Sequence, residues 1–312
     1  MRSLDLLTVR SFNSAITLYC GLYRGLHWCS LQSVRKNDTG CAFRDLERFM
    51  TTLVHISDVH FGDADSAKLD AALRAIEAIQ PACVLITGDL TQEGKLCEFA
   101  QADAWLKKVK APIVSCPGNH DTPMFNLALR FADPFGRYNR LGLRTTWQSS
   151  DSSIHIEAAN SARGLQGRMD WSQGDYGQLG VLEALDRLGG SRAQYKVLAL
   201  HHPPQTPEGA SVMSLPSGLN RFVKRLTLNP LDLLLCGHMH AAFDFPSSVL
   251  AGVRVMTVPS LASSRERGFG SGFGVLRFGA DNPMLVRSIW RYQEGSFKEA
   301  SELSKGTLHI AG

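Results

Sequence analysis

The chain has 312 residues, of which 44% are hydrophobic and 20% are charged. That length allows one large domain or two small ones, and the composition excludes a disordered chain. The 33 basic and 29 acidic residues leave a formal charge of +4 with no run of like charges, so we expect no broad basic face for nucleic acid. The sequence has no long apolar run, so we expect no membrane span.

The first 49 residues differ in composition from the rest of the chain. Up to Lys36 they carry five basic side chains against the single acid Asp5, and serines are frequent. This composition is typical of a mitochondrial-type targeting segment. The alternative, which we prefer, is an N-terminal extension outside the fold. The domain would then span residues 50–300, followed by a C-terminal tail over 301–312.

From Met50 onward, short apolar runs alternate with helix-like segments. The runs at 51–57, 82–88 and 111–118 read as buried strands, and the segments 65–80 and 95–110 between them read as helices. The polar residues that follow the three strands are 31 and 30 residues apart, the length of a strand–helix–strand unit. We therefore predict a βαβαβ arrangement with parallel strands.

Later apolar runs predict a second sheet. The runs 195–200 and 231–237 precede the polar stretches "HHPP" and "HMH", and four more runs read as further strands, at 152–160, 252–259, 273–279 and 284–292. The predicted fold class is α/β, a two-sheet βαβαβ sandwich flanked by helices. The stretch 121–150 has no periodicity apart from a short helical piece at 124–131, and we expect it to form a flap over the site.

Polar residues follow five of the predicted strands directly. Because the carboxyl ends of parallel strands meet at one edge, these side chains should lie together. Carboxylates, an amide and imidazoles without cysteine suit Mn, Fe, Zn or Co and disfavour a structural zinc site. They are too many for one ion, which favours two ions about 3.5–4 Å apart with a shared carboxylate. The set comprises Asp58, His60, Asp89, Asn119, His120, Asp121, His201, His202, His238 and His240.

The same blocks resemble a known family. "DVH", "GD", "GNHD", "HHPP" and "GHMH", between about residues 52 and 240, are similar to the signature blocks of the calcineurin-like metallophosphoesterases. "GDLTQEG", "CPGNHDTP" and "ANSARG" look most similar to its class III cyclic-nucleotide phosphodiesterase branch, which includes the bacterial CpdA/Icc-like proteins.

The resemblance implies a role for each matching residue. Asp89 would bridge two divalent or trivalent ions (Mn, Fe or Zn), with His202 outside the ligand set. His120 would face the substrate as the catalytic histidine, and Asp121 would orient it or cap the following turn. The first ion would be held by Asp58, His60 and His240, and the second by Asn119, His201 and His238.

The implied function is a dimetal phosphoesterase that hydrolyses small phosphodiesters by a metal-bridging hydroxide, with 3′,5′-cyclic nucleotides as candidate substrates. The alternatives are a phosphomonoesterase, a nuclease of the same superfamily and, in a different class, a non-catalytic metal-binding scaffold. A scaffold would be expected to lose ligands or His120, and all are present. The resemblance also suggests a homodimer. Seven cysteines in no paired spacing favour a reducing compartment, the cytoplasm.

Overall fold

The computed structural model describes residues 51–166, 170–210, 214–264, 269–279 and 285–300, together with the backbone of Met50 and of four short strands before it. Those four strands pair as two hairpins, each a two-stranded antiparallel sheet. Their bounds are β1 Thr8–Ser11, β2 Ser14–Thr17, β3 Tyr19–Tyr23 and β4 Leu26–Ser30. The expected tail at 301–312 lies outside the described residues.

The first large sheet is built around the predicted βαβαβ unit. Strands β5 (Met50–Ile56), β6 (Cys83–Thr87) and β7 (Ile113–Cys116) are parallel, and helices α2 (Ser66–Ile79) and α3 (Leu96–Leu106) connect them. The unit agrees with the prediction. On the other side of β5 follow three antiparallel strands, β14 Gly272–Gly279, β15 Leu285–Gln293 and β16 Ser296–Glu299.

The second sheet has the strand order β12-β13-β11-β10-β9-β8. Its four inner strands are parallel, and a short antiparallel strand closes each edge. The inner strands are β9 Ile154–Ala158, β10 Tyr195–Ala199, β11 Leu233–Cys236 and β13 Arg254–Thr257, and the edges are β8 Thr146–Gln148 and β12 Asp244–Pro246.

Two predicted strands belong to a different sheet from the one expected. The runs at 273–279 and 284–292 form β14 and β15, which extend the first sheet and not the second. The side chains of β14 explain its central place beside β5. Phe273 and Val275 pack on the helix side of the sheet, whereas Leu276 and Phe278 pack between the two sheets. Because β14 is shielded from water on both faces, its main-chain N–H and C=O groups need partners, which β5 and β15 supply.

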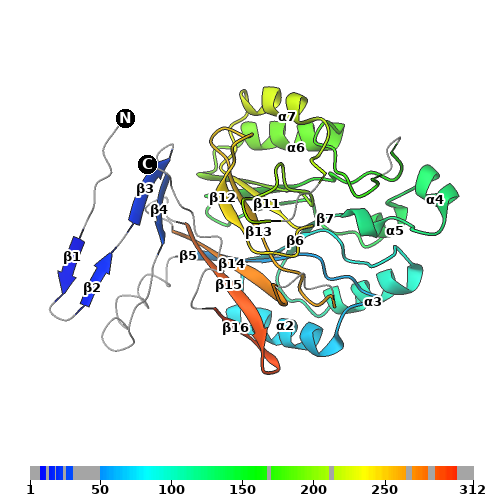
Figure 1. The fold of residues 1–312 in the computed structure, drawn as a ribbon, viewed down its shortest axis with the longest axis horizontal. Coiled ribbons are helices and arrows are strands. Elements are labelled where there is room, and N and C mark those ends of the chain that lie inside the picture. The colour runs from blue at the N-terminus through cyan, green and yellow to red at the C-terminus, as the bar shows by residue number, and fades with distance from the viewer. Residues whose placement is uncertain are drawn as a thin grey trace.

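The molecule is a four-layer sandwich with a hydrophobic cluster at each of its three interfaces (Figure 1). Helices α2 and α3 cover the outer face of the first sheet, and α6 (Leu179–Gly189) and α7 (Leu219–Leu226) cover the second. Alternate residues of β5 serve different layers, since Leu53 lies between the sheets and Val54 faces the helices. The sheets are therefore fixed against each other, and so are the loops at their edges.

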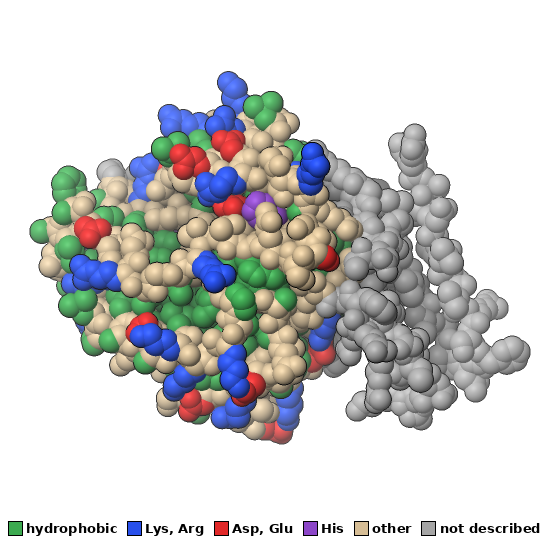
Figure 2. Space-filling model, turned by 180° about the vertical axis from the view of Figure 1, so that it is seen from behind, with side chains coloured by type: hydrophobic (Ala, Val, Ile, Leu, Met, Phe, Trp, Pro, Cys, Tyr) green, Lys and Arg blue, Asp and Glu red, His purple; other side chains and the backbone are tan. Residues whose placement is uncertain are grey.

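The predicted flap is a chain of short elements. A 3-10 turn at Asn119–Asp121, α4 at Leu127–Ala132 and α5 at Gly136–Asn139 lead into β8. On the molecular face seen from behind, Lys and Arg side chains are scattered and do not form a stripe (Figure 2). None of the described helices is long and apolar enough to cross a bilayer.

Candidate metal centre

Five strand ends bring the predicted metal-binding residues to one place. The loops after β5, β6 and β7 of the first sheet face those after β10 and β11 of the second, and all seven side chains meet between them. Six of the seven are buried, and His238 is half-buried, so the cluster opens to solvent beside His238. The seven are Asp58, His60, Asp89, Asn119, His201, His238 and His240.

One half of the cluster gathers two imidazoles and a carboxylate. His240 Nε2 lies 3.2 Å from Asp58 Oδ1 and 3.3 Å from His60 Nε2. His60 Nε2 is 3.9 Å from both Asp58 Oδ1 and Asp89 Oδ2. Three donor atoms that face one another this closely have the geometry to hold one metal ion.

The other half is centred on His201. Its Nε2 lies 3.1 Å from Asn119 Oδ1, 3.2 Å from His238 Nδ1 and 3.2 Å from Asp89 Oδ2. Asp89 Oδ2 therefore faces both halves, His201 on one side and His60 on the other. This is the position that a carboxylate shared between two ions requires.

Hydrogen bonds to the main chain orient the ring nitrogens. His201 Nδ1 donates to the Thr87 carbonyl at 2.7 Å, which leaves Nε2 free to face the cluster. His120 Nδ1 likewise donates to the Gln92 carbonyl at 2.7 Å. The sequence cannot predict these two hydrogen-bond acceptors, because every residue has a main-chain carbonyl.

The backbone at the cluster adopts an unusual conformation. Eight non-glycine residues of the described chain have a positive φ, and five of them are candidate ligands. The left-handed region is costly for such residues and persists where the surroundings impose it, often at functional sites. The strand-to-loop turns thus aim the side chains. The five are Asp58 (φ 52), His60 (φ 56), Asp89 (φ 52), His238 (φ 68) and His240 (φ 54).

Comparison with known proteins identifies the family. A family model described as calcineurin-like phosphoesterase matches residues 51–242. The chain belongs to the calcineurin-like phosphoesterase family. A "Probable cyclic nucleotide phosphodiesterase" from Vesicomyosocius okutanii is 24% identical over 248 residues, which cover 77% of this chain and 98% of the relative. The "3',5'-cyclic adenosine monophosphate phosphodiesterase CpdA" of Escherichia coli K12 is 24% identical over 223 residues, 67% of this chain and 75% of the relative.

The fold is shared with a solved dimetal enzyme. A dimetal phosphatase from Danio rerio aligns with a TM-score of 0.54 at 13% identity, covering 80% of this chain and 96% of that one. The described core agrees with a calcineurin-like phosphoesterase fold, as the motifs predicted. Family membership also makes the protein a metal-dependent phosphoesterase.

The electrostatics of this calcineurin-like phosphoesterase suit cations. Burial opposes ionisation of Asp58 and Asp89, but the neighbouring histidines hold the pKa of each carboxyl below its ordinary value. Burial alone would lower the pKa of His201, yet Asp89 raises it to about 9. Burial lowers the pKa of His60 to about 4, so that ring stays neutral. Charged carboxylates and imidazole nitrogens without a thiolate fit Mn, Fe or Zn.

The hydrogen bonds of the Asp121 carboxylate go to Thr91 and Gly118 and not to the His120 ring, which it would contact in the first of its two expected roles. The carboxylate accepts hydrogen bonds from Gly118 N at 2.9 Å, Thr91 N at 2.9 Å and Thr91 Oγ1 at 3.0 Å. It caps the turn Asn119–Asp121 that precedes it, and not the following turn that was considered as its alternative role. Burial and the nearby Asp89 raise the pKa of Asp121 to about 6.

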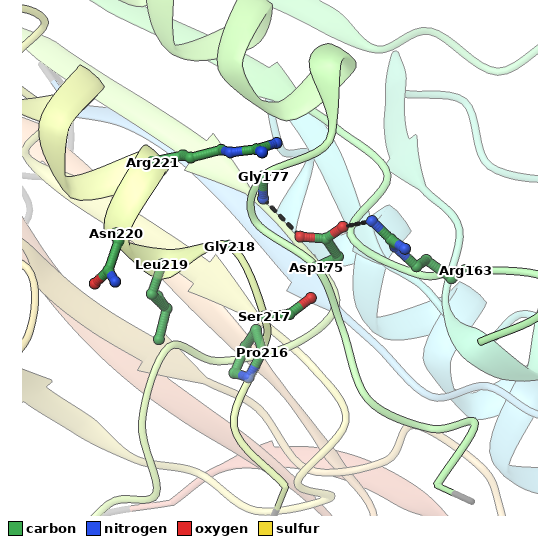
Figure 3. A pocket seen from close by; sticks show the side chains of 9 residues that line it. All are labelled: Arg163, Asp175, Gly177, Pro216, Ser217, Gly218, Leu219, Asn220 and Arg221. Carbon is green, nitrogen blue, oxygen red and sulfur yellow. Dashed lines mark hydrogen bonds and ion pairs between the residues drawn. The ribbon is translucent and has the colours of Figure 1, made fainter. Parts of the chain in front are cut away.

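Arg163 forms an ion pair with Asp175 at the edge of a cavity of about 520 Å³ (Figure 3). None of the seven candidate ligands lines that cavity. The guanidinium is about half exposed, whereas Asp175 is buried. The Arg163 guanidinium is thus paired with the carboxylate of Asp175.

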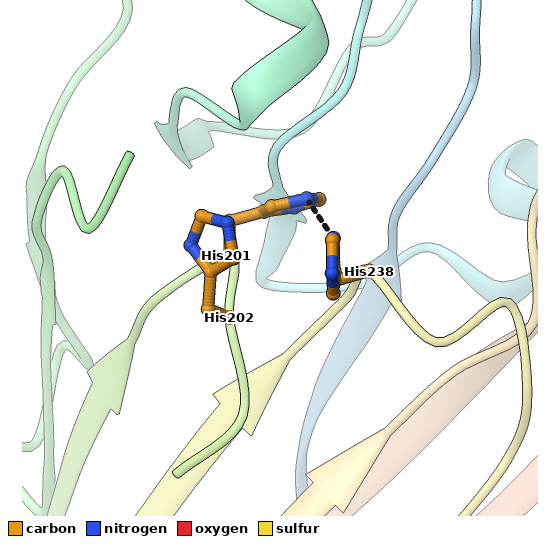
Figure 4. Close-up of side chains that lie close together, drawn as sticks. All are labelled: His201, His202 and His238. Carbon is orange, nitrogen blue, oxygen red and sulfur yellow. Dashed lines mark hydrogen bonds between the residues drawn. The ribbon is translucent and has the colours of Figure 1, made fainter. Parts of the chain in front are cut away.

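His202 lies beside His201 and His238 (Figure 4), and one nitrogen of each ring lies within 4.8 Å of the others. Its ring is 4.8 Å from the His201 ring and 4.8 Å from the His238 ring. Nδ1 bonds Ser161 Oγ at 2.9 Å and Nε2 bonds the Ser172 carbonyl at 2.7 Å. With both nitrogens occupied, the geometry favours leaving His202 out of the ligand set, although it is close enough to have been included.

Proposed function

We propose that the protein hydrolyses small phosphodiesters at a pair of metal ions, with 3′,5′-cyclic nucleotides as substrates. The observation that carries this proposal is the position of Asp89 Oδ2 between two groups of donors. The names of two relatives support cyclic nucleotides as the substrate class, since both are called cyclic-nucleotide phosphodiesterases.

The assignment of ligands follows the two halves of the cluster. Asp89 is shared, and a pair of bound cations lowers the pKa of water and neutralises phosphate charge. The ions are Mn, Fe or Zn, whose preferences these oxygen and nitrogen donors match. The first ion is held by Asp58, His60 and His240, and the second by Asn119, His201 and His238.

His120 is the proposed catalytic histidine. Its main-chain N–H donates to Asp89 Oδ1 at 2.8 Å, which ties the residue to the shared carboxylate. Its Nδ1 is held by the Gln92 carbonyl, and its ring lies edge-on to His60 with the centroids 4.9 Å apart. Nε2 is then the atom that protonates the leaving oxygen or stabilises its charge. Asp121 holds this turn in place through Thr91 and Gly118.

The rival functions have less support. A nuclease needs a basic stripe for the phosphate backbone, and the scattered Lys and Arg in Figure 2 do not form one on that face. A metal-binding scaffold would need the same donors but not His120, whose Nδ1 is held by the Gln92 carbonyl at 2.7 Å and whose ring lies edge-on to His60. A phosphomonoesterase would use the same ions, so the substrate panel below includes a monoester.

We further propose a cytoplasmic location and a homodimer, with residues 50–300 as the catalytic domain and 1–49 outside it. The described cysteines Cys83, Cys97, Cys116 and Cys236 are free, which suits a reducing compartment. Three of them are buried, and burial raises the pKa of the Cys83 thiol to about 12. Protonated, buried thiols act as small hydrophobic groups.

A substrate panel tests the proposed function. The Mn²⁺-loaded enzyme is assayed with 3′,5′-cyclic AMP, bis(p-nitrophenyl) phosphate and p-nitrophenyl phosphate. Both diesters should be hydrolysed, with the cyclic nucleotide preferred, and Asp89→Ala should abolish turnover because the shared ligand is lost. Asp103→Ala, on the exposed side of α3, is the matched control and should keep full activity. Full activity in Asp89→Ala, or hydrolysis of the monoester alone, would refute the proposal.

A further inference from the structure

The imidazole of His202 is buried beside the metal centre and has no part in the function proposed above. The residue is 2% exposed, and its two ring nitrogens bond to Ser161 and to Ser172. The Tyr176 hydroxyl donates to the His202 carbonyl at 2.7 Å. This residue thus connects the ligand-bearing end of β10 to the loop that passes over it.

The hydrogen bonds of His202 define a single tautomer. The Ser172 carbonyl can only accept, so Nε2 carries the hydrogen and donates it over 2.7 Å. Nδ1 is then the acceptor and takes the hydroxyl hydrogen of Ser161 at 2.9 Å. The same hydroxyl oxygen accepts from the His202 main-chain N–H at 3.3 Å. Every polar atom of this buried ring is satisfied without a metal ion.

The segment held by Nε2 borders the open side of the metal centre. Gly174 passes so close to the His202 ring that a Cβ there would lie 2.6 Å from its Cγ. Ser172 N donates to Asp170 Oδ1 at 3.0 Å, so the two residues form one turn. The His202 ring, against which Gly174 packs, lies 4.8 Å from the His238 ring, so the segment reaches the neighbourhood of His238. His238 is the half-buried member of the cluster.

We propose that His202 is a positioning residue that holds residues 170–175 as a wall of the substrate site beside His238. The inference rests on the proposed phosphodiesterase function. The wall contacts bound substrate and not the reacting atoms, so its loss weakens substrate binding more than it slows the chemical step. Nε2 is the atom that matters, because it is the ring nitrogen that is hydrogen-bonded to the wall, through the Ser172 carbonyl.

A matched pair of variants separates the two nitrogens. In His202→Gln the amide nitrogen lies near the position of Nε2 and can still donate to Ser172, whereas in His202→Asn the shorter amide reaches only as far as Nδ1. With bis(p-nitrophenyl) phosphate and Mn²⁺, His202→Asn should raise KM about tenfold and change kcat less than about twofold. His202→Gln should have the KM of the parent, and both variants should bind as much Mn²⁺ as the parent.

Equal KM values in the parent and both variants, or loss of Mn²⁺ from both variants, would overturn the proposal. If His202→Asn does not fold, two-bond ¹H–¹⁵N spectra of the histidine-labelled parent replace it. His202 should be the Nε2–H tautomer both with and without Mn²⁺, whereas a metal-bound Nε2 would overturn the inference. This spectrum does not depend on turnover, so a parent that binds Mn²⁺ but hydrolyses no diester would refute the proposed function alone.

Discussion

At the scale of single residues, the sequence predicted which polar side chains lie together, but not the groups that orient them. Asp58, Asp89 and His201 each follow an apolar strand, and that order points to one sheet edge. The carbonyl of Thr87 leaves no trace in residue type, and the left-handed φ of Asp58 leaves only a weak one, since Asp adopts it more often than most residues. The glycines of "GD", "GNHD" and "GHMH" are the only local signal of these tight turns.

Gly118 should be intolerant of even a methyl group. A Cβ there would overlap Asp89 Oδ1 and lie 2.6 Å from Asp89 N, so the shared carboxylate would have to move. A shift of about 1 Å is enough to lower activity about a hundredfold, and we expect Gly118→Ala to do so in the diesterase assay. The control is Gly180→Ala in α6, where nothing lies within 4 Å of the added atom. Equal activity of the two variants would contradict the geometry.

His55 should make stability depend on pH. Burial and the charge of Arg287 lower its pKa to about 3, so below pH 6.5 the unfolded chain binds a proton that the folded chain does not. Stability is therefore complete at pH 7 and falls as the pH drops toward 3. Between pH 7 and pH 5 this histidine should account for about 2 kcal/mol of the free energy of unfolding.

Urea unfolding of the parent and of His55→Gln, both in chelator, measures the contribution of His55 to the free energy of unfolding at each pH. The variant should lose about 2 kcal/mol less than the parent between the two pH values. Identical losses would show that His55 titrates normally in the folded protein.

At the scale of elements, periodicity located α2, α3 and the longer strands of both sheets. It missed α6, α7 and the short strands β8, β12 and β16, and it did not give the partner of every strand. The helix at α2 and the parallel order β5-β6-β7 follow from apolar spacing and connection length. β14 was assigned to the wrong sheet because burial on both faces looks the same in either one. Its antiparallel pairing with β5 depends on contacts more than 200 residues apart in the chain.

Helix α2 should depend on its N-cap. Asp65 Oδ1 accepts from Ala67 N at 2.8 Å and from Lys68 N at 3.4 Å, which satisfies two amides that have no partner within the helix. Asp65→Ala should reduce the free energy of unfolding by about 1 kcal/mol. Asp70→Ala, on the exposed face of the same helix, should change it by less than about 0.5 kcal/mol. Urea titration of both variants checks this, and a reversed order would exclude the capping role.

At the scale of the whole molecule, the candidate metal centre depends on the packing of the two sheets, because loops from both sheets contribute its side chains. Asp58, Asp89 and Asn119 come from the first sheet, and the three histidines after β10 and β11 come from the second. The motifs were sufficient to predict the family and the sandwich. The attachment of residues 170–175 to His202, on which the proposed substrate wall rests, is visible only in three dimensions.

Metal removal should destabilise the fold as a whole. Ions that bind only the folded chain stabilise it by mass action, about 4 kcal/mol at a thousand times Kd. Adding Mn²⁺ to chelator-treated protein should therefore raise Tm, and Asp89→Ala should lose most of that rise. The same Tm with Mn²⁺ and with chelator would count against a metal centre that joins the sheets.

The most direct test of the account is a crystal of the Mn²⁺-loaded protein, with anomalous scattering used to locate the metal. We predict two anomalous peaks, one for each metal ion, about 3.5–4 Å apart, with the Asp89 carboxylate in contact with both. A single peak, or two peaks of which Asp89 touches only one, would contradict it.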